Sequence, residues 1–274
     1  MIVETGRGRF TVRRTGDAGP PVLLLHPLAL SGAVWDQVAA FLGGAYRAVA
    51  MDARGHGGSS WDGRPFTVAD MAADAAAVIE ELDLGPAHVV GMSMGGSTAL
   101  VLAETRPDLV DGLVIADGTA CYGPDRERTW AERARKAVDV PRDRQVEFQL
   151  DRWFSADFRT RHPDEAERVA DIFRRTDSRA HAAACTALGD LDATAGLGEV
   201  RARTLVLAGA EDYATPPAMA EALASGIPGA ELRILEATRH LSLIERPDTW
   251  PLIDRHLTPN AAEQASAVRE GRDG

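Results

Sequence analysis

Three polar residues, far apart in the sequence, have the types and surroundings needed to make an alcohol reactive. Ser93 stands in GMSMG, a G-x-S-x-G pattern between an apolar run and the helical stretch GGSTALVLAE. A serine hydroxyl needs a base to take its proton, and an imidazole base needs an acceptor that holds its tautomer. Both partners follow in the order acid, then base: Asp212 after the run 203–209, and His240 after the run 230–236. This constellation predicts a nucleophilic serine.

Each of these assignments has an alternative. Ser93 in a glycine-rich turn can act simply as the N-cap of the following helix. Glu211 is a second carboxylate beside Asp212, although the expected loop geometry favours Asp212. Of the seven histidines, only His240 follows the last predicted strand, and this position favours it as the base.

Acyl transfer also needs two N–H donors for the developing oxyanion. Met94 directly follows the serine and begins a predicted helix, so its amide is the first predicted donor. The second is predicted in HPLALSG, where Leu28 follows Pro27, which has no N–H to donate.

These residues require a sheet whose strands end at one edge. Short apolar runs occur at 21–26, 47–52, 87–92, 111–117, 203–209 and 230–236, and helical patterns at 34–42, 67–82, 94–104, 216–224 and 249–256. Strands this apolar are expected to be buried on both faces. The alternation predicts an α/β fold with a mostly parallel central sheet and helices on both faces. The stretch RFTVRR is predicted to lie in an antiparallel hairpin at the sheet edge.

The strand rhythm stops between 123 and 197, where the sequence is helical and rich in charges. This segment predicts a helical cap inserted into a core formed by 1–122 and 198–257. Residues 258–274 are small and polar, and are predicted to form a flexible tail.

Composition narrows the range of partners. A net charge of -11 disfavours nucleic acid and anionic membrane surfaces. The N-terminus lacks the apolar run of a secretory signal and no segment has the ~18 apolar residues of a membrane span, so a cytoplasmic protein is expected. The two cysteines lack metal-ligand spacing. A homo-oligomer is compatible with this sequence.

With these features the chain resembles the α/β-hydrolase superfamily over 21–257. The resemblance is carried by MDARGHGGSS, GMSMGG and ATRHLSLIERP. Within the superfamily, the cap stretches RWFSADFR and CTALGDLD are similar to those of the 3-oxoadipate enol-lactone hydrolases of the β-ketoadipate pathway. The chain departs from that pattern at His181, where the family has a glycine, and in LSLIE, which replaces LSNIE.

The resemblance implies a serine hydrolase that opens a small carboxylate-bearing lactone through an acyl-enzyme, without a metal or an organic cofactor. The carboxylate implies a cation at the pocket, and the cap offers Arg133, Arg135 and Arg152. Trp130, Arg133 and Trp153 are the expected substrate contacts, and Phe154 is a further aromatic that could line the pocket.

Three other functions fit the same residues. The first is a carboxylesterase, or a lactonase for a secondary metabolite, with the same three catalytic residues. The second is a cofactor-free lyase, cyclase or dioxygenase in which His240 is the base and Ser93 donates a hydrogen bond. The third is a non-catalytic receptor for a small molecule.

Overall fold

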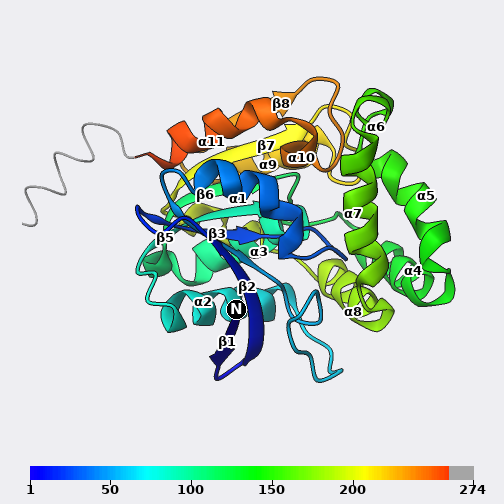
Figure 1. Ribbon diagram of the computed structural model, residues 1–274, viewed down its shortest axis with the longest axis horizontal. Helices are drawn as coiled ribbons and strands as arrows, with labels where there is room; N and C mark the ends of the chain where they lie inside the picture. The colour runs from blue at the N-terminus through cyan, green and yellow to red at the C-terminus, as the bar shows by residue number, and fades with distance from the viewer. Residues whose placement is uncertain (259–274) are drawn as a thin grey trace, which may run out of the picture.

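The computed structural model describes residues 1–258, and an eight-stranded sheet forms its centre (Figure 1). Residues 259–274, which make up nearly all of the predicted tail, lie outside the described residues. In spatial order the strands are β1 (Ile2–Thr5), β2 (Gly8–Thr15), β4 (Arg47–Met51), β3 (Pro21–Leu25), β5 (Ala87–Met92), β6 (Val110–Ala116), β7 (Arg203–Gly209) and β8 (Glu231–Leu235). Strand β2 pairs antiparallel with both β1 and β4, and all later neighbours in this order are parallel. The predicted fold class and edge hairpin are confirmed.

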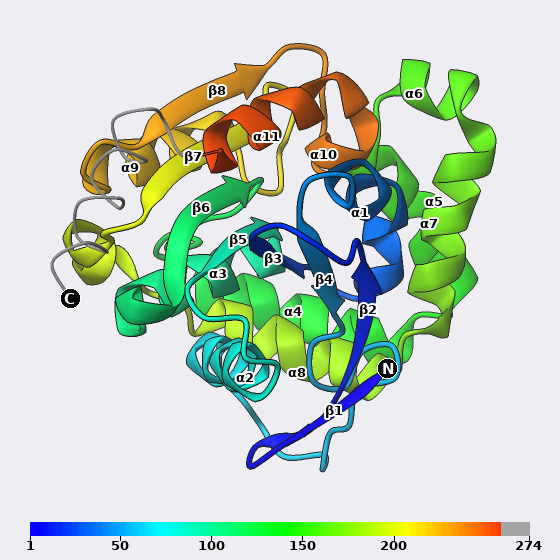
Figure 2. The same cartoon turned by 60° about the vertical axis from the view of Figure 1, so that its left-hand side comes forward.

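Helices cover both faces of the sheet (Figure 2). One face carries α2 (Val68–Glu81), α3 (Met94–Thr105) and α9 (Pro217–Gly226), and the other carries α1 (Asp36–Leu42), α10 (Ser242–Glu245) and α11 (Trp250–Leu257). Alternate strand residues divide between the two apolar clusters: Leu23 and Val89 face the first, whereas Leu24 and Val90 face the second. None of the helices within 1–258 has the length and apolar character to cross a bilayer.

Two local expectations need correction. The stretch 34–42 is not helical in one piece, because a 3-10 turn over Gly32–Trp35, capped by the Ser31 hydroxyl, precedes α1. Strand β8 is not buried on both faces: it has one strand neighbour, β7, and its residues are exposed or partly exposed. Its apolar residues therefore belong to an edge strand.

Five helices between β6 and β7 form the inserted cap and are called the cap helices below. They are α4 (Arg126–Asp139), α5 (Arg142–Trp153), α6 (Ala156–Arg161), α7 (Pro163–Arg175) and α8 (Ser178–Gly189). Figure 1 shows them together on one side of the sheet. The hydroxyl of Thr176 donates to the carbonyl of Ala29 (2.8 Å), and the amide of Leu241 donates to the carbonyl of Trp153 (3.1 Å). These bonds attach the cap to the loops after β3 and β8. The domain boundaries themselves stay a prediction.

Candidate active site

Ser93 is the single residue between the end of β5 and the start of α3. Its backbone has φ 56° and ψ -119°, a strained conformation for a residue with a side chain. The flanking glycines are needed because a Cβ on Gly91 would collide with the carbonyl of Gly95, and a Cβ on Gly95 would collide with the carbonyl of Leu25. The chain can therefore turn this corner while presenting the Ser93 hydroxyl at the carboxyl edge of the sheet.

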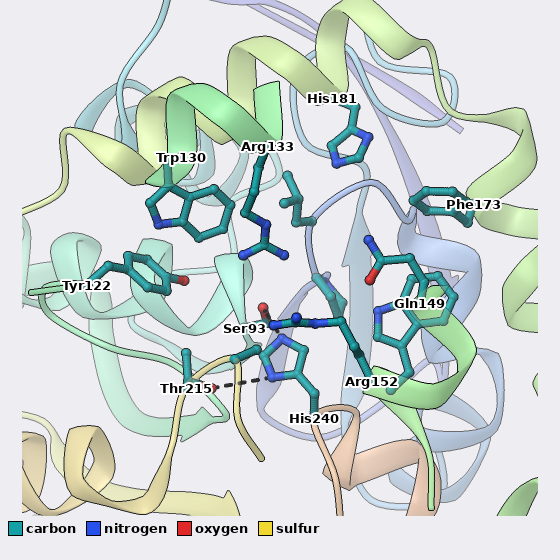
Figure 3. A pocket seen from close by; sticks show the side chains of 14 residues that line it. Ser93, Tyr122, Trp130, Arg133, Gln149, Arg152, Phe173, His181, Thr215 and His240 are labelled. Atoms are coloured by element: carbon teal, nitrogen blue, oxygen red, sulfur yellow. Dashed lines mark hydrogen bonds between the residues drawn. The ribbon is translucent and has the colours of Figure 1, made fainter. Parts of the chain in front are cut away.

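The structure brings Ser93, His240 and Asp212 together in a continuous hydrogen-bonded chain. Ser93 Oγ lies 2.8 Å from His240 Nε2 (Figure 3), and His240 Nδ1 lies 2.7 Å from Asp212 Oδ2. With Nδ1 donating to the carboxylate, Nε2 is free to accept the serine proton. Glu211, the alternative acid, is exposed and approaches Arg239 at 3.6 Å instead.

The charges of this pair stabilise each other against the cost of burial. Burial lowers the pKa of His240, but the charge and hydrogen bond of Asp212 outweigh it, so the pKa lies above the ordinary 6.5. Burial would raise the pKa of Asp212, but His240 and hydrogen bonds from Thr215 bring it below its ordinary value. Asp212 thus stays ionised and can stabilise a protonated imidazole.

Asp117 is a second buried carboxylate at this edge that sequence reasoning missed. It follows β6, is 1% exposed, and accepts hydrogen bonds from the amides of Gly209 (3.2 Å) and Ser242 (2.9 Å). Its own carbonyl accepts from the Thr215 hydroxyl at 2.9 Å. Burial, reinforced by the charge of Asp212, raises the pKa of Asp117 to about 7. Asp117 links the loops that carry the acid and the base. Its position at a strand's carboxyl end was the available signal.

The loop after β3 is braced by His26, a histidine outside the hydrogen-bonded chain of Ser93, His240 and Asp212. His26 Nδ1 lies 2.7 Å from the carbonyl of Pro27, and the amide of Ala53 donates to His26 Nε2 at 2.9 Å. Burial lowers the pKa of His26 to about 4, so the ring is neutral. Leu28, the residue after Pro27, lines the same cavity as Ser93. Met94 is the first residue of α3. The oxyanion role of Leu28 and Met94 stays a prediction.

A cavity of ≈ 30 Å³ lies directly beside Ser93, between the carboxyl edge of the sheet and the cap helices. Its lining residues are Pro27, Leu28, Ser93, Tyr122, Trp130, Arg133, Gln149, Arg152, Trp153, Phe173, His181, Ala214, Thr215 and His240. This set holds two arginines and no aspartate or glutamate, in a chain with a net charge of -11. The cavity lining is therefore locally cationic.

The two arginines are held by aromatic rings and lack carboxylate partners. Arg133 lies 4.1 Å from the ring centre of Trp130, and Arg152 lies 4.6 Å from that of Tyr213. Figure 3 shows both side chains pointing from the cap helices toward Ser93. Within residues 1–258 neither forms an ion pair or a side-chain hydrogen bond, so their N–H groups are available to a ligand.

The cap residues named from the sequence line the cavity, with two exceptions. Arg135 is exposed and does not line the cavity, and Phe154 is fully buried against Phe158, with ring centres 4.7 Å apart. Gln149 and His181, which the sequence analysis did not name as contacts, also line the cavity. Their spacing in the sequence gave no signal, although His181 was visible as a departure from the enol-lactone hydrolase pattern.

His181 presents a neutral ring to this cavity. Arg142 Nη1 donates to His181 Nδ1 at 2.9 Å, which leaves the ring proton on Nε2. Burial, assisted by the charge of Arg142, keeps the pKa of His181 well below 6.5. The imidazole can thus donate one hydrogen bond from Nε2 without carrying a charge.

A larger cavity of ≈ 450 Å³ adjoins the first one and shares Tyr122, Trp130, Arg133, Arg152 and Ala214 with it. Arg126 and Lys136 add positive charge to its lining, and Glu132 is its one acidic residue. This larger space gives an approach to Ser93 between α4 and the loop after β7. No cluster of three or more His, Cys, Asp or Glu residues suited to a metal ion occurs within 1–258.

The fold and the site geometry agree with a known family. A family model described as the alpha/beta hydrolase fold matches residues 20–247. The chain belongs to the α/β-hydrolase family. Members of this family share one sheet architecture and differ in chemistry, so the resemblance read from the motifs is confirmed at the level of the family.

Among its relatives is 3-oxoadipate enol-lactonase 2 of Acinetobacter baylyi, 28% identical over 236 residues, covering 86% of this chain and 87% of that protein. The enol-lactonase structure from Burkholderia xenovorans LB400 superposes with a TM-score of 0.89 at 28% identity, covering 94% of this chain and 100% of that one. The malate-bound thermophilic esterase from Thermogutta terrifontis gives 0.85 at 26% identity, over 93% of this chain and 96% of that one. The predicted similarity to enol-lactone hydrolases is confirmed.

Proposed function

We propose that this protein is a serine hydrolase that opens a small lactone bearing a carboxylate, with 3-oxoadipate enol-lactone as the favoured substrate. The observation that carries the proposal is the pair Arg133 and Arg152, which point toward Ser93 without a carboxylate partner within 1–258. The carboxylate of the substrate would pair with one of these two guanidinium groups. The similarity to two named enol-lactonases supports the choice of lactone.

In this proposal Ser93 Oγ attacks the ring carbonyl while His240 Nε2 takes its proton, and Asp212 stabilises the resulting imidazolium. The amides of Leu28 and Met94 stabilise the oxyanion. The ring C–O bond then breaks and gives an acyl-enzyme. The leaving oxygen is an enolate, which receives a proton and tautomerises to a ketone. His240 next activates a water molecule, which releases the acid and restores Ser93.

The test is a substrate panel with the wild-type protein and two variants. The wild type should hydrolyse the enol-lactone with a much higher kcat/KM than p-nitrophenyl acetate. Ser93→Ala should reduce lactone turnover by a factor of about 10³ or more, because alanine has no hydroxyl to attack the ring carbonyl. Arg135→Gln, an exposed residue of the cap, should leave turnover unchanged and is the control. Hydrolysis of p-nitrophenyl acetate without hydrolysis of the enol-lactone would reject the enol-lactone as the substrate.

A carboxylesterase is the second candidate, favoured by the likeness to the Thermogutta terrifontis esterase. It would use the same Ser93 chemistry and accept esters that lack a carboxylate. A fluorophosphonate that labels Ser93 would support either hydrolase. Native turnover of a non-ester substrate by Ser93→Ala would instead support the lyase alternative, and binding without any turnover would support the receptor.

A further inference from the structure

Opening a carboxylate-bearing lactone changes the charge that the pocket must hold. Water adds across the acyl C–O bond: its oxygen enters a new carboxyl group, one hydrogen goes to the former ring oxygen, and the new acid releases a proton at neutral pH. The substrate is therefore a monoanion, whereas the product is a dianion. A pocket built for the substrate alone requires one cation.

The Ser93 cavity has two cations, held on different helices. Arg133 belongs to α4 and rests on Trp130, while Arg152 belongs to α5 and rests on Tyr213. Both line the cavity, and no acidic side chain lines it with them. Burial, and after it the charge of Arg133, lowers the pKa of Arg152. Two anionic groups at this place would relieve the repulsion between the two arginines.

The rest of the lining suits a short carbon chain between two carboxylates. Trp153 and Phe173 supply apolar surface, with ring centres 5.4 Å apart. Gln149 and the neutral ring of His181 supply uncharged N–H donors in the same cavity. Carboxylate oxygens accept hydrogen bonds from such donors as well as from guanidinium groups.

We propose that the Ser93 cavity, together with the larger cavity that adjoins it and shares both arginines, is a binding site for short aliphatic dicarboxylates, with Arg133 holding one carboxylate and Arg152 the other. This inference rests on the proposed function for its origin, because the natural dianion is the ring-opened product. It adds that the product and its stable analogues occupy the pocket more tightly than monocarboxylates of equal length. Dicarboxylates of four to six carbons therefore compete with the substrate.

The test compares adipate with hexanoate, which have the same number of carbons and differ by one carboxylate. Titration calorimetry on the wild-type protein at low salt should show adipate binding ~10-fold or more tightly, as expected for one additional charge-assisted bidentate contact. Adipate should also inhibit p-nitrophenyl acetate hydrolysis competitively. Equal affinities of the two acids would overturn the proposal.

Variants locate the two contacts. Arg133→Gln and Arg152→Gln should each reduce the preference for adipate over hexanoate to about threefold or less, whereas Arg135→Gln on the same helix as Arg133 should keep it. An adipate preference that survives both cavity variants would contradict the assignment. Salt provides a measurement without any variant, because the preference in the wild type should fall as NaCl rises from 20 to 500 mM, on the order of several-fold.

Failure of this inference can be told apart from failure of the proposed function. Dicarboxylate binding that depends on both arginines, in a protein that does not turn over the enol-lactone, supports the site and rejects the substrate. Efficient lactone turnover without preferential adipate binding rejects the dicarboxylate site and keeps the substrate.

Discussion

His240 is held between the Ser93 hydroxyl, which it deprotonates in the proposed mechanism, and a carboxylate that raises its pKa. Only the neutral imidazole can accept the Ser93 proton, so kcat/KM should fall as the pH drops through the pKa of His240. Since that pKa lies above the ordinary 6.5, the loss should begin at a higher pH than for a free histidine. A profile of kcat/KM between pH 4 and 9 measures it.

Asp212→Asn should lower kcat by a factor of about 10⁴, because the amide favours the wrong imidazole tautomer. The acid limb of the residual activity should also move to lower pH, since the charge that raises the His240 pKa is gone. Glu211→Gln removes the neighbouring exposed carboxylate and should leave the profile in place. A large loss in Glu211→Gln, with Asp212→Asn active, would reverse the assignment of the acid.

At the scale of elements, the corner between β5 and α3 depends on residues without a Cβ. Gly95→Ala should destabilise the protein by roughly 1–3 kcal/mol or more, because the added methyl meets the rigid backbone of Leu25 rather than a side chain that can move. The melting temperature measures this effect. Gly44→Ala is the matched control, since its Cβ meets only the Phe41 carbonyl at 3.9 Å. Equal melting temperatures for the two variants would show that the corner can relax.

Glu104 on α3 makes the packing of this helix sensitive to pH. Its Oε1 atom is buried without a hydrogen-bond partner among the described residues, and burial raises its pKa to about 7. A folded-state pKa above the ordinary 4.5 means that folding favours the protonated acid, so stability falls as pH rises through this interval.

Glu104→Gln cannot ionise and should lose this penalty. Its stability relative to the wild type should therefore increase between pH 5 and pH 8, as measured by urea unfolding at both pH values. Glu81→Gln, an exposed residue near the end of α2, should show no such increase. If the stability difference between Glu104→Gln and the wild type does not change with pH, the folded protein does not disfavour ionised Glu104.

Over the whole molecule, charge is distributed unevenly. The net charge is -11, yet Arg126, Arg133, Lys136 and Arg152 gather around the approach to Ser93. A local positive field attracts an anionic substrate, and salt screens that attraction. The kcat/KM for the anionic lactone should fall several-fold between 20 and 300 mM NaCl, whereas that for neutral p-nitrophenyl acetate should change little. Parallel curves for the two substrates would show that this field has no part in capture.

The sequence alone determined the fold class and the sheet edge at which Ser93, Asp212 and His240 lie, and the coordinates supplied the hydrogen bonds that join them. The first depends on the local alternation of apolar runs and helical patterns. The second follows from topology, because the residues just after parallel strands lie at the same edge of the sheet. The same rule indicates the edge position of Asp117, but its link between two loops required the coordinates.

Only the tertiary structure decided which cap residues face the nucleophile and how exposed β8 is. Arg133 and Arg135 are two positions apart on one helix, so at 3.6 residues per turn they point to nearly opposite sides. The charge-rich sequence of α4 does not say which side of the helix faces the cavity. That choice depends on how five helices pack over the strand ends, a set of contacts between residues distant in the chain, and it places Arg133 in the cavity and Arg135 in solvent.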